Sequence, residues 1–299
     1  LVSAPLALGR CGGSDASADS ATVAIAANGR SPQDSALDSA AAQVYFIGSD
    51  ARGPGVYRVA STGGAVTDVL VGAPLVQPQS LVVSSDDKTI FVADAQGGGG
   101  GAIFAIAGSS GAVTRTLASG THPRGIDVIS QGGADQIFFT GSDSTSGMPG
   151  LFRVSADGSG LSTVAKGSPF RDPSGVVTTR AGEAYVTDTP GASGQGRIIH
   201  VAGGSASELM SNLWLGKPAG ISITSDESTL VVSALNPASA TDQVLLINLA
   251  SRGVTTFTKD IGQNSAAGGV HRSRNSDTFS WADLRGSVGS GTVYTITFK

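Results

Sequence analysis

The stretch QPQSLVVSSDDKTIFVADA, residues 77–95, decides the fold, because its order of elements recurs along the whole chain. It contains a proline, a short apolar run, an acidic turn, and a second apolar run that ends in Asp. The same point in the pattern is marked by Pro32, Pro78, Pro123, Pro173, Pro218 and Ala267, at intervals of 46, 45, 50, 45 and 49 residues. The chain therefore contains six repeats.

Each repeat holds three or four short apolar runs. The second run is exemplified by IFVAD from Ile90, the third by AIFAI from Ala102, and the fourth, present in five repeats, by AVTRTLA from Ala112. The runs are too short for helices and are rich in Val, Ile, Phe and Thr, which favours strands. Four short strands at a period of about 40 to 50 residues are typical of a β-propeller blade. We therefore predict an all-β protein, a six-bladed β-propeller of four-stranded blades.

The two ends of the chain predict how the ring closes. The sixth repeat reaches residue 299 after only three runs, whereas TVAIAA, residues 22–27, is strand-like and belongs to no repeat. We predict that this N-terminal strand completes the last blade, because such a pairing removes an unpaired edge. The prediction is a single propeller domain over residues 21–299, and a ring that closes its own edges predicts a monomer.

Residues 1–20, LVSAPLALGRCGGSDASADS, differ from the repeats and predict a signal remnant followed by a flexible tether. Cys11 is the only cysteine, so no disulfide forms within the chain. Its place after an apolar segment resembles the lipidated cysteine of bacterial lipoproteins, although Arg10 stands where that family has a small residue. We expect an exported protein, periplasmic and lipid-anchored at Cys11, or secreted; an ordinary unstructured start with a free thiol is the remaining alternative.

Composition and charge exclude other classes of partner. The chain has 43 Gly, 12 Pro, 5% aromatic and 14% charged residues, which describes many turns joined by short apolar segments. Its net charge is −4 and its 19 Lys and Arg are scattered, which argues against nucleic acid. No segment approaches the roughly 20 apolar residues of a membrane-spanning helix.

The motifs Pro-x-Gly-Ile and Asp-x-x-x-Ile-Phe-Val-Ala-Asp of the repeats resemble those of the NHL and YVTN repeats. More loosely, residues 22–299 resemble the six-bladed fold of the gluconolactonases. The resemblance implies that the loops between blades and those between second and third strands share one face around a central channel, the usual ligand site. On that face it places, from the inter-blade loops, His122, Arg124, Arg171, Asp172 and Lys217. The cationic members predict a site for an anionic group.

The resemblance also places three strand-end carboxylates on that face, Asp94, Asp188 and Asp283. They have two possible roles. Asp at a strand end often caps a turn, as we also expect for the acidic turns at residues 85–88 and 225–228. Alternatively, the three together would hold a metal ion, and carboxylates suit Ca²⁺.

The innermost strands offer a second candidate site. Their apolar positions alternate, so the intervening residues face the channel or the adjoining blade: Val82, Asp127, Val177, Ser222 and His271. Asp127 and His271 are ionisable and belong to the third and sixth repeats, which lie opposite each other in a ring of six. A shared ligand or water network joins them, or each is bonded locally.

Two functions remain. The chain has no G-x-S-x-G elbow, no P-loop and no triad spacing. Its three Glu, at positions 183, 208 and 227, do not match the early-blade metal ligand of the gluconolactonases. The first hypothesis is therefore an exported, non-catalytic propeller that binds a small molecule, a polymer or a protein at the loop-rich face. The alternative is a metal-assisted lactone or ester hydrolase that uses the three strand-end Asp.

Overall fold

The structure is a computed structural model of the chain. It describes residues 21–190, 195–216, 218–239, 241–262, 267–284 and 290–298, with only the backbone of Ala267. Residues 1–20, including Cys11, lie outside this range, as does Lys217, so the predictions on them stay predictions. None of the helical structure in the described ranges is long and apolar enough to cross a membrane.

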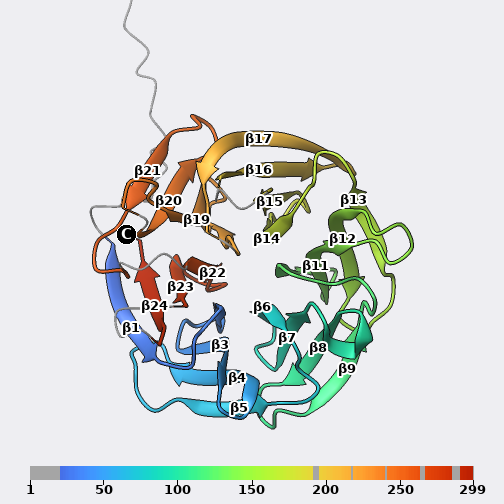
Figure 1. The fold of residues 1–299 in the computed structure, drawn as a ribbon, viewed down its shortest axis with the longest axis vertical. Coiled ribbons are helices and arrows are strands. Elements are labelled where there is room, and N and C mark those ends of the chain that lie inside the picture. The colour runs from blue at the N-terminus through green and yellow to red at the C-terminus, as the bar shows by residue number, and fades with distance from the viewer. Residues whose placement is uncertain are drawn as a thin grey trace, which may run out of the picture.

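The described strands form six four-stranded antiparallel sheets arranged as a ring (Figure 1). Blades 1 to 3 run from the innermost to the outermost strand as β2 (Asp34–Leu37), β3 (Gln43–Asp50), β4 (Gly53–Ala60), β5 (Thr67–Val71); β6 (Pro78–Val83), β7 (Thr89–Asp94), β8 (Ala102–Ala107), β9 (Val113–Leu117); and β10 (Ile126–Gln131), β11 (Ala134–Ser142), β12 (Pro149–Ser155), β13 (Ser162–Lys166).

Blades 4 to 6 follow the same order: β14 (Pro173–Thr178), β15 (Ala184–Asp188), β16 (Gln195–Ala202), β17 (Ser205–Trp214); β18 (Ile221–Ile223), β19 (Thr229–Leu235), β20 (Asp242–Asn248), β21 (Val254–Phe257); and β22 (Ala267–Arg272), β23 (Thr278–Asp283), β24 (Thr292–Thr297), β1 (Thr22–Asn28). The chain is a six-bladed β-propeller, as the repeats predict.

The N-terminal strand closes the ring. β1 pairs antiparallel with β24, from Thr22 opposite Thr297 to Asn28 opposite Thr292, with a bulge between Ile25 and Ala27. Figure 1 shows β1, in blue, beside β24, in red. The last blade thus gains its fourth strand from the start of the chain, which confirms the predicted closure and leaves no unpaired edge on β24.

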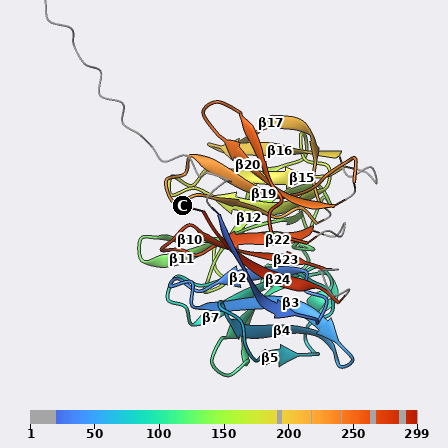
Figure 2. The same ribbon diagram turned by 90° about the vertical axis from the view of Figure 1, so that its left-hand side faces the viewer.

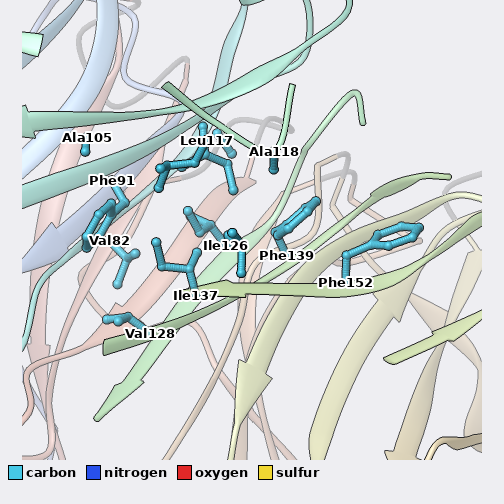
Figure 3. Close-up of a cluster of buried hydrophobic side chains, with 13 residues drawn as sticks. Val82, Phe91, Ala105, Leu117, Ala118, Ile126, Val128, Ile137, Phe139 and Phe152 are labelled. Carbon is cyan, nitrogen blue, oxygen red and sulfur yellow. The ribbon is translucent and has the colours of Figure 1, made fainter. Parts of the chain in front are cut away.

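The core lies between neighbouring blades rather than inside any one of them. The edge-on view shows the blades stacked around the ring axis (Figure 2). Between blades 2 and 3, Phe91 and Ile103 pack in one cluster with Ile126, Ile137 and Phe139 (Figure 3). The second strand of each blade is therefore covered on both faces, which explains why its sequence is a continuous apolar run. Each fully buried Phe or Ile contributes about 1.5–3 kcal/mol.

We call the face that carries the turns between first and second strands the turn face, and the opposite one the loop face. On the turn face, a carboxylate of one blade bonds the preceding blade. Asp87 accepts hydrogen bonds from the amide and hydroxyl of Ser39, and Asp277 accepts them from the amide and hydroxyl of Ser225. These carboxylates act as latches between blades.

The acidic turns also bond within themselves. Asp86 accepts the hydroxyl of Ser84 at 2.7 Å and the Lys88 amide at 3.1 Å, and Asp226 bonds its own turn in the same way. Asp86 and Asp226 therefore confirm the structural interpretation of these turns, because a side-chain oxygen satisfies amides that the turn leaves unpaired.

Candidate functional site

The channel opens into a cavity of about 390 Å³ at the turn face. All six innermost strands contribute to its lining. Its walls include the apolar side chains of Val82, Val128 and Val177, and Asp127 and His271 lie among them. This cavity lies at the end of the channel opposite the one that the family resemblance implied.

The channel narrows toward the loop face, where only about 20 Å³ is open. The reason is the glycine of the Pro-x-Gly motif. A Cβ on Gly125 would lie 1.9 Å from the Ser174 carbonyl oxygen, and one on Gly220 would lie 2.4 Å from the Val270 nitrogen. Real Cβ atoms do not approach so closely, so glycine lets the inner strands of blades 3 to 6 press against the next blade and narrow the channel at this level.

Asp34 replaces this glycine in blade 1 and forms the centre of a buried network. Its Oδ1 accepts the Ser35 amide at 2.8 Å, while Oδ2 accepts the Leu81 amide at 3.0 Å and the Ser80 hydroxyl. His271 Nε2 lies 3.1 Å from Oδ2, and because a carboxylate accepts, Nε2 carries the proton. The side chain of Asp34 is 1% exposed. One carboxylate thereby ties blades 6, 1 and 2 together.

Sequence reasoning missed Asp34. The sequence contains a signal for it. Four repeats have Gly two residues after the Pro or Ala that marks the repeat, whereas blade 1 has Asp34 and blade 2 has Ser80 at that position. A break in the repeat was the clue to a special side chain. Gly269, at the same place in blade 6, makes the room: a Cβ there would lie 1.6 Å from Asp34 Oδ1.

Burial and two nearby carboxylates have opposite effects on the pKa of His271. Burial by itself lowers the pKa of His271, but the nearby Asp34 carboxylate, through charge and hydrogen bond, and the charge of Asp127 together raise this pKa above 6.5. The side chain is 12% exposed, and it lines both the wide and the narrow part of the channel. The imidazole is thus held as a donor to Asp34 at the waist of the channel.

Asp127 projects from the opposite blade. Its Oδ2 accepts the Thr178 amide at 2.7 Å and the Thr178 hydroxyl at 2.6 Å. Burial raises the pKa of Asp127 above 3.8, although the hydrogen bonds from Thr178 and the charge of His271 oppose it. Asp127 and His271 therefore line one cavity, as the strand alternation predicts, but each is bonded to a neighbouring blade and not to the other.

Three arginines lie around the mouth of the cavity, Arg180, Arg272 and Arg274. Arg272 donates from Nε to the Ile223 carbonyl oxygen at 2.8 Å and from Nη1 to carbonyl oxygens of its own turn. The ion pairs of Arg272 with Asp277 and of Arg180 with Glu227 are long, 3.9 Å each. These arginines carry no signal in the sequence, because nothing in the repeat shows which turns surround an open channel mouth.

The residues predicted on the loop face mostly serve local contacts. Arg124 forms an ion pair with Asp172 across the boundary of blades 3 and 4, so the structure brings these two together. His122 Nδ1 lies 2.9 Å from the Ala95 carbonyl oxygen. Arg171 donates its backbone amide to Asp188. Arg124 also lines the narrow end of the channel, and a ligand role for these side chains stays a prediction.

The three strand-end carboxylates lie in alternate blades, 2, 4 and 6. Asp94 accepts four backbone amides, from Val76, Gln77, Gln96 and Gly97, at 2.7–3.0 Å. Asp188 bonds the backbone before β14 and the guanidinium of Arg197 at 2.8 Å. Asp283 ends β23, 0% exposed.

The structure does not bring these carboxylates together. Across the described ranges, no three His, Cys, Asp or Glu side chains converge as a metal site requires. The Ca²⁺ role of Asp94, Asp188 and Asp283 stays a prediction. Two of the three Glu, Glu183 and Glu227, lie beside turns of the turn face, and Glu208 lies in the outer strand β17.

No family model and no curated protein matches the chain. Among solved structures, a gluconolactonase from Xanthomonas campestris has a TM-score of 0.62 at 15% identity, over 93% of this chain and 90% of that one. A nidogen/laminin complex gives 0.59 at 19% identity, over 76% of this chain and 79% of that one. TolB from Acinetobacter baumannii gives 0.57 at 14% identity, over 78% of this chain and 55% of that one, about half of TolB. Identities this low show the fold alone.

Proposed function

We propose that the protein is a non-catalytic binding propeller that holds a small polar solute in the cavity at the turn face. The observation that carries the proposal is the cavity itself, about 390 Å³, whose lining combines apolar side chains of the inner strands with a larger number of hydroxyl and ionisable side chains. Sites for small molecules are concave and have volumes of about 300–1,000 Å³, and a lining rich in polar groups suits a polar solute. The narrow loop end offers about 20 Å³, which supports the choice of the turn face.

The site moves to the other end of the channel relative to the sequence prediction, but the function class is the same. Binding of a polymer or a partner protein at the loop face stays a prediction. Export, with a lipid anchor at Cys11, is part of the proposal and rests on residues 1–20. Labelling of the wild-type protein, but not of Cys11→Ser, with a radioactive fatty acid in a bacterial host supports the anchor; equal labelling contradicts it.

A plug at the cavity mouth tests the proposed site. Ser130 is exposed and lines the cavity, whereas Ser205 is exposed on the outer strand β17 and does not line it. We expect a library of small polar solutes to contain members that raise the melting temperature of the wild type and of Ser205→Trp but not of Ser130→Trp. If no solute of any charge raises it, or if Ser130→Trp responds equally, the proposed function is wrong.

A further inference from the structure

The cavity has opposite charges on opposite walls. Blade 6 supplies Arg272 and Arg274, together with His271, which is paired with Asp34, and blade 3, directly across the ring, supplies Asp127. Asp87, Arg180 and Glu227 also line the cavity, but Asp87 accepts hydrogen bonds from Ser39, and Arg180 and Glu227 form an ion pair of 3.9 Å with each other. Figure 1 shows these two blades, with β22 and β11, on opposite sides of the channel. A ligand that spans the cavity therefore meets positive charge at one end and negative charge at the other.

The cationic wall is short of anions. Arg274 forms no ion pair within the described part of the chain, and its buried Nε has no hydrogen-bond partner there. Arg272 has its guanidinium fixed by backbone carbonyl oxygens, with its acid, Asp277, 3.9 Å away and bonded to Ser225. Fixed guanidinium groups with weak internal partners are suited to a carboxylate, which accepts charge-assisted hydrogen bonds from them.

The acidic wall can still accept a donor. Thr178 bonds Oδ2 of Asp127, and the carboxyl group lines the cavity, where a carboxylate oxygen can accept more than one donor. Burial is the main influence on this carboxyl group and raises its pKa. A cation placed beside a carboxylate that is held out of water is strongly favourable, because it offsets the lost hydration.

Apolar side chains of the inner strands lie between the two charged ends, beside hydroxyl groups such as that of Ser222. Val82 and Val177 are 7% and 6% exposed, and both line the cavity together with Ile223. They would cover the carbon skeleton of a ligand while its charged ends reach Arg274 and Asp127. The volume of about 390 Å³ admits a molecule of amino-acid size and excludes a folded polymer.

We infer that the solute is a small zwitterion of amino-acid type, with its carboxylate toward Arg272 and Arg274 and its ammonium group toward Asp127. The inference rests on the proposed function and gives the chemical class of its ligand. A zwitterion would contact both charged walls. A simple anion would contact only the arginines, and a simple amine would contact only Asp127.

The test compares zwitterions with analogues that carry a single charge, and 6-aminohexanoate differs from each analogue in one end group. Titration calorimetry on the full chain compares leucine, γ-aminobutyrate and 6-aminohexanoate with hexanoate and hexylamine, which each lack one of the two charges. At least one zwitterion should bind roughly tenfold or more tightly than both single-charge analogues, the factor expected for one additional charge-assisted hydrogen bond.

Two variants assign the ends. Asp127→Asn keeps an oxygen for Thr178 and should weaken the zwitterion roughly tenfold without affecting hexanoate, whereas Arg274→Gln should weaken both. Asp157→Asn and Arg115→Gln, at exposed positions on blades 3 and 2, are the matched controls and should change nothing.

The outcomes separate the two proposals. If hexanoate or hexylamine binds as tightly as every zwitterion, or if Asp127→Asn leaves zwitterion binding unchanged, the zwitterion inference is wrong and the binding cavity stands. The inference is again wrong if none of the five probes binds while other solutes raise the melting temperature of the wild type but not of Ser130→Trp. If no solute shows this difference between the wild type and Ser130→Trp, both proposals fail.

Discussion

Asp34 is the side chain whose loss should most weaken the ring. It is buried and accepts hydrogen bonds from Ser35, Ser80, Leu81 and His271. In Asp34→Asn, an NH₂ group replaces one oxygen. Whichever way the amide turns, at least one buried N–H donor then faces another donor, because Ser35 bonds one oxygen and Leu81 and His271 the other.

The magnitude follows from these contacts. A buried donor left unsatisfied costs about 1–3 kcal/mol, and breaking a buried charged pair costs about 3–5 kcal/mol. Since Asp34→Asn does both at the same point, we expect it to lower the free energy of unfolding by about 3–5 kcal/mol. At roughly 2–4 °C per kcal/mol for a domain of this size, the melting temperature should fall by about 6 °C or more.

Urea unfolding followed by tryptophan fluorescence measures the effect. Trp281 is fully buried in blade 6 and stacks on Tyr294 with ring centroids 5.2 Å apart, so it reports on the blade that Asp34 contacts. Asp157→Asn, at an exposed turn of blade 3, is the control and should change stability by less than about 0.5 kcal/mol. A loss below about 1 kcal/mol in Asp34→Asn would refute the argument that this carboxylate joins three blades.

The same network predicts a pH dependence. The pKa of His271 is raised in the folded state, so its charge stabilises the protein fully below the unfolded pKa of about 6.5, and this contribution is lost as pH rises through the folded pKa. The groups facing it are Asp34 from blade 1 and Asp127 from blade 3. The stability difference between wild type and His271→Gln should therefore shrink from pH 6 to pH 9. A constant or growing difference would contradict it.

Three further predictions concern other contacts. Asp277→Ala should lower the free energy of unfolding by about 1–3 kcal/mol, because it leaves the Ser225 amide without its latch, while Asp260→Asn, at an exposed position, should not; equal stabilities in urea would contradict the latch. Deletion of residues 21–28 should lower the melting temperature, because it exposes the β24 edge; an unchanged value would contradict closure. If Asp94, Asp188 and Asp283 hold Ca²⁺, chelation should lower the melting temperature and added Ca²⁺ should restore it. At a hundredfold excess over Kd, Ca²⁺ should raise the free energy of unfolding by about 2.7 kcal/mol. No change would contradict the metal prediction and the hydrolase alternative.

The sequence by itself determined the number of blades, the four strands of each and the closing strand. The reason is that every blade is built from neighbouring hairpins, so its pattern of apolar runs and turns is written locally and repeats. The alternation along the inner strands also placed Asp127 and His271 on the side that faces the channel or the adjoining blade. These properties depend only on strand period and repeat length, which are visible without a partner.

Only the tertiary structure decided which end of the channel is open and what surrounds it. Gly125 and Gly220 narrow the loop end because their strands approach the next inner strand too closely for a Cβ. Asp34 meets His271 across 237 positions of sequence, through the closure of the ring. Arg274, in the turn after β22, lines the cavity that the six inner strands enclose. Distances between blades are set by the packing of the whole ring, and no single repeat contains that information.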